Sequence, residues 1–215
     1  MSIERALVIG AGGAVGHATA RALTAAGAAV LAAGHERDAT DPAQVAALLA
    51  EADPDLVVVA AGTRPQMAAI DEQTWASFSA PWNIDVKIAF EVGRAALARP
   101  LRAGSTVVVV SSGAALNGSP LSGGYAGAKR MQMFLAGYLQ RAADARQLGI
   151  RFVAVAPRAF LVGTPIGDAA AAAYGAKTGP LDPTGVARAI VSTASGDEHP
   201  DATALVVTDK GLEAI

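Results

Sequence analysis

Short apolar runs recur along the chain and are separated by longer, mixed segments. They lie at residues 5–9, 29–33, 55–60, 105–110, 151–155 and 203–207 and are rich in Val, Ile, Leu or Ala. The runs are continuous rather than alternating, which is typical of strands that helices cover on both faces of a parallel sheet. The pattern therefore predicts six strands in one parallel sheet.

Stretches rich in Ala and Leu, long enough for helices, lie between these runs at 16–26, 43–52, 71–98, 122–147 and 184–195. Alternating strands and helices with right-handed crossovers predict an α/β fold, a Rossmann-type doubly wound parallel sheet with helices on both faces. No linker or shift of composition interrupts residues 1–215, which favours a single domain. Residues 34–42 are too few for another helix and strand, so we expect one edge of the sheet to be reduced there.

Composition narrows the possible partners. Of 215 residues, 52% are hydrophobic and 17% charged, which is enough apolar material for a large core. The net charge is −2 and no block of like charge occurs, so the electrostatic footprint of a nucleic-acid or anionic-membrane binder is missing. The chain has no Cys, which excludes disulfides, thiolate metal sites and cysteine nucleophiles. We expect a small-molecule partner, no metal and a cytoplasmic protein, because the first apolar run is too short for a signal peptide or a membrane span.

A glycine-rich segment follows the first apolar run directly. Residues 10–16 read GAGGAVG and continue into HATARAL, a good helix. Gly10 permits a tight turn, Gly13 lets the backbone approach a pyrophosphate, and Gly16 allows close packing of helix on strand. The N–H groups and the dipole of the helix N-terminus favour a phosphate. The segment predicts a dinucleotide site at Gly10, Gly12, Gly13, Ala14, Val15 and Gly16, with a merely tight strand-to-helix turn as the alternative.

Nucleoside triphosphate hydrolysis finds no support in the sequence. A Walker-type phosphate loop requires Gly-Lys followed by Ser or Thr, and no such tripeptide occurs in the chain.

A second cluster of polar residues follows the run at 105–110. Ser111 and Ser112 end this run, and Tyr125 comes thirteen residues after Ser112, near the start of a predicted helix. Lys129 lies four residues after Tyr125, so both side chains share one helical face.

The glycine loop, Ser112, the Tyr125-x-x-x-Lys129 pair and the upstream Asn83 together resemble the short-chain dehydrogenase/reductase family. The resemblance extends from about residue 5 to residue 211. It implies hydride transfer between a nicotinamide cofactor and a small carbonyl or alcohol substrate. By resemblance, Tyr125 is the general acid/base, Ser112 holds the reacting oxygen, and Asn83 holds a water that links Lys129 to solvent.

The implied chemistry agrees with the properties of the side chains. A free phenol has a pKa of about 10, so alcohol oxidation near neutral pH requires its phenolate to be stabilised by roughly three units, or about 4 kcal/mol. A nearby ammonium provides such stabilisation. The resemblance gives this part to Lys129, which also holds the hydroxyls of the nicotinamide ribose.

Residues 34–39 bear on which nicotinamide cofactor is bound. Family members that prefer NAD usually carry an acid eighteen residues beyond the last glycine of the loop, and that position is Gly34 here. The cations His35 and Arg37 follow and resemble the 2′-phosphate contacts of NADP-preferring members, which favours NADP(H). Glu36 favours the alternative, NAD(H), because it can reach the ribose hydroxyls.

Asp38 and Ala39 begin a segment that matches the acid–x–hydroxyl–acid pattern of the family. By resemblance its first acid contacts the adenine amino group. The same segment suits an N-cap for the next helix, and both roles can hold together.

Two segments depart from the family pattern. Ala60-Ala61-Gly62 stands where Asn-Asn-Ala-Gly is usual, and Pro157 precedes Arg158 where Gly is typical. Arg158 is a candidate anchor for a substrate carboxylate, with an ordinary surface ion pair as the alternative. The resemblance still implies cofactor contacts at Ala60, Ala61, Gly62, Pro157 and Thr164, the last arriving about two residues late.

The leading hypothesis is an NADP(H)-dependent carbonyl reductase or alcohol dehydrogenase. The rivals are a non-catalytic nicotinamide-nucleotide regulator, an NAD-dependent dehydrogenase, and an extended-branch epimerase or dehydratase, for whose substrate domain 215 residues leave no room. The region from Thr164 to Pro183 is expected to form the lid of the site. Trp75, Phe78 and Trp82 mark core or subunit contact, and the resemblance implies a homodimer or homotetramer.

Overall fold

The computed structural model describes residues 3–161, 163–175, 181–196 and 198–215. Its centre is a seven-stranded sheet in the order β2-β1-β3-β4-β5-β6-β7. The first six strands run parallel, and β7 is antiparallel to β6. The strands are β1 (Arg5–Ile9), β2 (Ala29–Ala33), β3 (Leu56–Val59), β4 (Thr106–Val110), β5 (Arg151–Pro157), β6 (Ala204–Thr208) and β7 (Gly211–Ala214).

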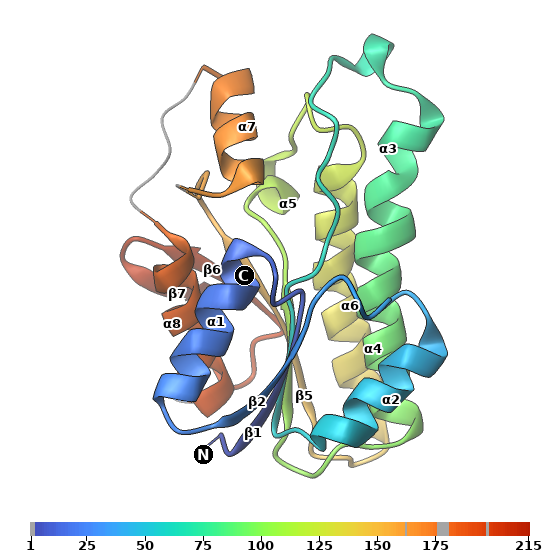
Figure 1. Cartoon of the computed structure of the whole chain (residues 1–215), viewed down its shortest axis with the longest axis vertical. Helices are drawn as coiled ribbons and strands as arrows, with labels where there is room; N and C mark the ends of the chain where they lie inside the picture. The colour runs from blue at the N-terminus through green and yellow to red at the C-terminus, as the bar shows by residue number, and fades with distance from the viewer. Residues whose placement is uncertain (1–2, 162, 176–180, 197) are drawn as a thin grey trace.

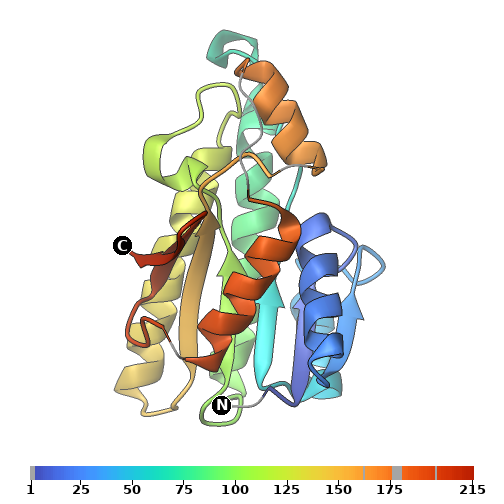
Figure 2. The ribbon, with the colours of Figure 1, turned by 90° about the vertical axis from the view of Figure 1, so that its left-hand side faces the viewer.

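Helices cover both faces of this sheet (Figure 1). On one side α1 (Ala14–Ala25) packs against α8 (Pro183–Ser195), and on the other α4 (Lys87–Ala98) lies between α2 (Pro42–Ala52) and α6 (Tyr125–Ala145). Figure 2 shows α1 and α8 standing side by side in front of the strands. The predicted doubly wound α/β architecture is confirmed.

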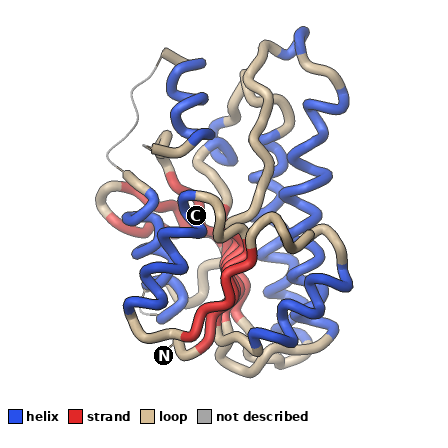
Figure 3. The backbone as a smooth tube through the Cα atoms, viewed as in Figure 1, coloured by secondary structure: helices blue, strands red, loops and turns tan. Residues whose placement is uncertain are grey.

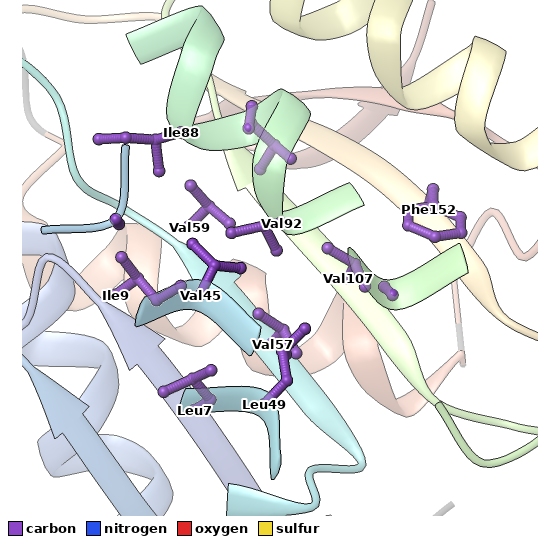
Figure 4. Packing of buried hydrophobic residues seen from close by; sticks show 14 of the residues in the cluster. Leu7, Ile9, Val45, Leu49, Val57, Val59, Ile88, Val92, Val107 and Phe152 are labelled. Atoms are coloured by element: carbon purple, nitrogen blue, oxygen red, sulfur yellow. The ribbon is translucent and has the colours of Figure 1, made fainter. Parts of the chain in front are cut away.

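The core explains why the strands read as continuous apolar runs. Every residue of β3 is buried, because alternate side chains enter two different helix layers. Val57 and Val59 pack beneath α2 and α4 with Val45 and Val92, as Figure 4 shows. The other two side chains of the strand face α1 and α8.

The reduced edge lies at β2. The chain passes from β2 into α2 and then returns to β3 on the far side of β1, so no strand pairs with the outer side of β2 in the described sheet. This is the reduced edge of the sheet that residues 34–42 predicted. Figure 3 shows the strands in red between the helices that cover them.

The sequence pattern did not predict β7. Its four residues, GLEA, include no β-branched or aromatic side chain and lie mostly at the surface. They form a strand because a tight turn at Asp209 and Lys210 brings them back along β6. Pairing with an existing strand therefore overrides a weak local preference.

The single helix expected over 71–98 was also wrong. A short 3-10 turn, η1 (Ile70–Glu72), precedes α3 (Trp75–Pro81), whose start is fixed by a capping box between Thr74 and Ser77. The wide turn η2 (Trp82–Val86) is π-helical and joins α3 to α4. Such bulges in long helices recur at functional sites.

The carboxyl ends of the parallel strands point toward the upper end of the molecule in Figure 1, where α7 (Pro165–Ala173) and the short α5 (Ala114–Asn117) lie. Loops at this edge are the usual binding region of an open α/β sheet. Part of the expected lid, residues 176–180, falls outside the described residues. Within the described parts of the chain, no helix has the length and apolarity needed to cross a membrane.

Candidate active site

A cavity of about 800 Å³ opens at the carboxyl edge of the sheet. Its walls come from the loops after β1, β3, β4 and β5 and from α5, α6 and α7. Ser112, Tyr125 and Lys129 line it together with residues of the glycine loop. The fold therefore joins the two clusters that the sequence singled out, although Ser112 lies 96 positions beyond Gly16.

The glycine loop has the shape of a phosphate cradle. Gly10 has a φ of 88°, in the left-handed region that glycine adopts readily, and a Cβ there would collide with the backbone of Ala61. A Cβ on Gly16 would collide with the Gly10 carbonyl. The helix α1 can therefore approach the strand β1 this closely only if residue 16 is glycine.

The end of α1 fits an anionic group. Its N-cap, Gly13, offers no side-chain cap, and its first turn contains no acid. Gly13, Ala14 and Val15 line the cavity. Uncapped N–H groups and the positive end of the helix dipole suit a dinucleotide pyrophosphate, so these residues fit such a cofactor.

Tyr125 and Lys129 begin helix α6, and both side chains turn inward. Tyr125 is 9% exposed and Lys129 6% exposed. The Lys129 Nζ lies 5.5 Å from the centre of the Tyr125 ring and donates a hydrogen bond of 3.2 Å to the carbonyl of Val110. One helical turn therefore sets a phenol beside an ammonium at the end of β4.

Ser112 lies opposite this pair at the start of the loop after β4, and its side chain is partly buried. Its Oγ accepts a hydrogen bond of 3.3 Å from the N–H of Ala114. The neighbouring Ser111 also lines the cavity, but its hydroxyl donates to the Lys129 carbonyl at 2.8 Å. The Ser112 hydroxyl donates no hydrogen bond within the described residues, so of the two serines it is the one with a proton to offer a bound oxygen.

The structure does not bring Asn83 into this group. Asn83 is exposed, its amide donates to the Ser79 hydroxyl at 3.4 Å, and it lines a separate groove between α4 and α6. Instead, Asp85 reaches Lys129, with its Oδ2 3.1 Å from the Nζ. The π-helical turn rotates position 85 inward and position 83 outward. Sequence reasoning missed Asp85, although an acid within the apolar stretch IDVKIAF was a signal for it.

The ion pair with Asp85 determines the charge state of Lys129. Burial by itself lowers the pKa of the Lys129 ammonium, but attraction to Asp85, and to the phenolate form of Tyr125, outweighs burial and raises it. A raised pKa means that the charged form gains stability on folding, a gain that is complete below the ordinary pKa of lysine and lost as pH rises through the folded value. Lys129 is therefore charged at neutral pH.

The loop after β2 holds the predicted adenosine contacts, outside the main cavity. The Glu36 carboxylate accepts a hydrogen bond of 2.8 Å from the N–H of Gly34, and this bond, with a second one to its own backbone, lowers the pKa of Glu36. Arg37 forms an ion pair of 3.3 Å with Glu51 on α2. His35 is exposed and has no ion pair within the described chain.

Asp38 and Ala39 differ in their surroundings. The Asp38 carboxylate accepts hydrogen bonds from the hydroxyl and N–H of Thr40, at 2.7 and 2.9 Å, and these bonds lower the pKa of Asp38. Ala39 is buried in the core beneath α2, so only its backbone is available to a ligand. The N-cap of α2 is Asp41, which accepts from the N–H of Ala43.

Of the remaining predicted cofactor positions, some line the cavity and one lies beneath its surface. Ala60, Gly62, Pro157 and Thr164 line the cavity, whereas Ala61 packs against Gly10 beneath the loop. Thr164 also accepts from the N–H of Gly167 and so caps α7. Arg158, which is exposed, lies on the cavity wall.

The far wall of the cavity is formed by a helix within the region that the sequence analysis expected to be the lid. Residues 165–173 form α7, and Tyr174 at its end stacks on Phe160 with ring centres 6.0 Å apart. The Tyr174 hydroxyl lies 3.0 Å from Ser119 Oγ and accepts from the N–H of Leu121. These contacts tie α7 to the loop before α6 across the mouth of the cavity. No group of three or more His, Asp or Glu side chains able to hold a metal occurs among the described residues.

Comparisons with known proteins agree with this geometry. The family model of the RmlD substrate binding domain matches residues 4–114, just over half of the chain. In sequence, no curated protein is significantly similar.

Solved structures share the fold over nearly the whole chain. A short chain dehydrogenase from Mycobacterium avium superimposes with a TM-score of 0.74 and 23% identity, over 99% of this chain and 84% of that one. Two short chain dehydrogenases from Burkholderia cenocepacia J2315, both in complex with NADP, give TM-scores of 0.76 and 0.75 at 24% and 18% identity. They cover 94% and 98% of this chain and 95% and 91% of their own. From its glycine loop to the serines after β4, the chain belongs to the RmlD substrate binding domain family and is a member of the short-chain dehydrogenase/reductase group.

Proposed function

We propose that the protein is a carbonyl reductase or alcohol dehydrogenase that uses NADP(H), with Tyr125 as its general acid/base. The observation that carries the proposal is the convergence of Tyr125, Lys129 and Ser112 on one cavity that also contains the uncapped end of α1. A site that only binds a nucleotide has no need of a buried phenol beside a buried ammonium, because the glycine loop and the end of α1 already suit the pyrophosphate.

The side chains divide the work of the reaction. When bound, a nicotinamide cofactor would supply the hydride that the carbonyl carbon accepts. Ser112 donates a hydrogen bond to the carbonyl oxygen and orients it, and Tyr125 gives this oxygen its proton as negative charge develops. Lys129 stabilises the phenolate that remains on Tyr125. The products are the alcohol and the oxidised cofactor, and a proton from solvent restores the phenol.

The direct test is to mix the protein with NADPH and a panel of small ketones and aldehydes and to follow the loss of reduced cofactor. We expect turnover of some members of the panel and saturation with substrate. Cofactor binding measured by fluorescence, without oxidation of any compound above the blank, contradicts the reductase. That result supports the second candidate, a nucleotide-binding regulator.

The charges after β2 support two cofactor choices. His35 and Arg37 support NADP(H), since the ion pair of Arg37 with Glu51 is exposed and costs little to exchange for a 2′-phosphate. Glu36 supports NAD(H) as the second choice, because its carboxylate already lies against Gly34 at the end of β2.

For NADP(H), we expect tighter binding of NADPH than of NADH, and Glu36→Gln raises the NADPH affinity by about tenfold at low salt by removing one negative charge near the phosphate. Fluorescence titration with both cofactors measures this. Glu213→Gln, at the opposite edge of the sheet, is the matched control and leaves both affinities unchanged. Tighter binding of NADH by the original chain, together with its loss in Glu36→Gln, assigns NAD(H) instead.

Two cations support an acidic group on the substrate. Arg64 and Arg158 both line the cavity, and neither forms an ion pair within the described residues. The carbonyl panel therefore includes pairs that differ only by a carboxylate. We expect Arg158→Ala to raise KM for the acidic member of a pair about tenfold while leaving the neutral member unchanged. Equal KM changes for both members remove Arg158 from substrate recognition.

We also propose that the protein forms a homodimer or homotetramer through the outer faces of α4 and α6. These faces carry the exposed aromatic side chains of Phe90, Phe134 and Tyr138, and Trp82 on the adjoining turn η2 is exposed beside the groove that contains Asn83. The mass of the protein in solution tests this, and a monomer at micromolar concentration contradicts it.

A further inference from the structure

The acidic partner of Lys129 is sealed inside the protein. Asp85 is 0% exposed, and its Oδ1 accepts a hydrogen bond of 2.7 Å from the N–H of Thr63. Its Oδ2 lies 3.1 Å from the Lys129 Nζ and has no hydrogen bond elsewhere in the described chain. The carboxylate is therefore committed to this ammonium.

Several parts of the fold hold Asp85 in this position. The π-helical turn η2 directs it toward α6, where Gln132 donates a hydrogen bond of 3.0 Å to the Asp85 carbonyl. Gly62 leaves room for the carboxylate, since a Cβ at that position would come within 2.8 Å of Oδ2. The glycine at position 62 and the π-helical turn both destabilise the local backbone. An ion pair on the surface would need neither of them.

Few other charges act on this pair. Helix α3 has no titratable residue, and on α4 Lys87 faces the outer groove while Glu91 is paired with Arg94. On α6 the next cation, Arg130, lies over the Phe134 ring. Arg64 and Arg158 reach the cavity from loops and are both exposed. Asp85 is the one acid on the described wall of the cavity.

We propose that Asp85 is a positioning residue that neutralises most of the Lys129 charge and thereby biases the site toward carbonyl reduction. Because the ammonium is shared with a carboxylate at 3.1 Å, the positive potential that reaches Tyr125 is weaker than that of an unshared lysine. A weaker positive potential stabilises the phenolate less, and the phenol is the form that reduction consumes. The effect on catalysis rests on the proposed function. The effect of Asp85 on the potential at Tyr125 does not, and it can be measured without turnover.

Titration of the tyrosine tests this without substrate or cofactor. The ultraviolet absorption of tyrosinate is followed against pH, and the same curve for Tyr125→Phe is subtracted to remove Tyr138 and Tyr174. We expect Asp85→Asn to move the midpoint of the Tyr125 titration down by about one pH unit, because the ammonium is no longer shared. A midpoint that stays in place or rises overturns the proposal.

A second variant keeps the test valid if Asp85→Asn does not fold. The double substitution Asp85→Asn with Lys129→Met replaces the buried pair by neutral groups of similar size, a change that proteins often tolerate. We expect its midpoint to lie within about half a pH unit of the original chain, since the pair already acts as nearly neutral. A midpoint raised by about one unit or more shows that Lys129 acts as an unshared cation, and the proposal falls.

The catalytic consequence is measured with a substrate found by the carbonyl panel. In Asp85→Asn we expect the pH at which alcohol oxidation reaches half its maximum to fall with the titration midpoint, while KM changes little. Glu91→Gln, which removes another buried, paired acid on α4, is the control and leaves the pH profile unchanged. A shifted titration without any turnover in the original chain contradicts the reductase alone, whereas turnover without a shift contradicts the part given to Asp85.

Discussion

Tyr125→Phe is expected to reduce the rate of carbonyl reduction by a factor of about 10²–10⁴, the contribution usual for a positioned proton donor. The substitution removes one oxygen atom and leaves the ring of this buried residue, which is 9% exposed, in the same place at the start of α6. The carbonyl oxygen then has no acid beside it when negative charge develops. Cofactor affinity changes little, because the glycine loop and the end of α1 are untouched.

Steady-state rates with NADPH, together with cofactor titration, measure this effect. Tyr138→Phe is the matched control, since it is the same substitution on the same helix at a side chain that is 50% exposed and lies outside the cavity. We expect Tyr138→Phe to keep the original rate. Activity of Tyr125→Phe within about threefold of the original excludes Tyr125 as the acid.

Gly16→Ala is expected to destabilise the protein by about 2–3 kcal/mol and to weaken cofactor binding at least about tenfold. A Cβ at this position would strike the carbonyl of Gly10. That carbonyl cannot move away easily, because it accepts a hydrogen bond of 3.0 Å from the N–H of Gly13 and Gly10 itself is wedged against Ala61. Either α1 shifts away from β1 or the phosphate loop deforms, and both displace the N–H groups that face the cavity.

Urea unfolding and fluorescence titration measure the two effects. Gly12→Ala is the comparison for stability, because a Cβ on Gly12 meets nothing within 4 Å. We expect its free energy of unfolding to stay within about 0.5 kcal/mol of the original. If Gly16→Ala and Gly12→Ala unfold with equal free energies, the close approach of residue 16 to the Gly10 carbonyl does not constrain the loop, and the prediction is wrong.

Local sequence signals were sufficient for the parallel strands and most of the helices. The apolar runs at β1, β3 and β4 are continuous because both faces of these strands are buried, and that burial leaves a direct trace in the sequence. The glycine loop is equally readable, since a Cβ on Gly16 would strike the carbonyl of Gly10, which lies nearby along the chain. The pair Tyr125 and Lys129 follows from helical spacing alone.

The tertiary structure decided the features that depend on a partner distant in sequence. The strand β7 exists because β6 offers it an edge, and the residue that meets Lys129 depends on one extra residue in the turn η2. A regular helix and a π-helical turn have similar compositions, so the sequence could not show whether Asn83 or Asp85 faces inward. The chain by itself determined the fold and marked the residues proposed for phosphate binding and proton transfer, through local spacing and burial. Only the packing of η2 against α6 determined that the ammonium of Lys129 has a buried counter-charge.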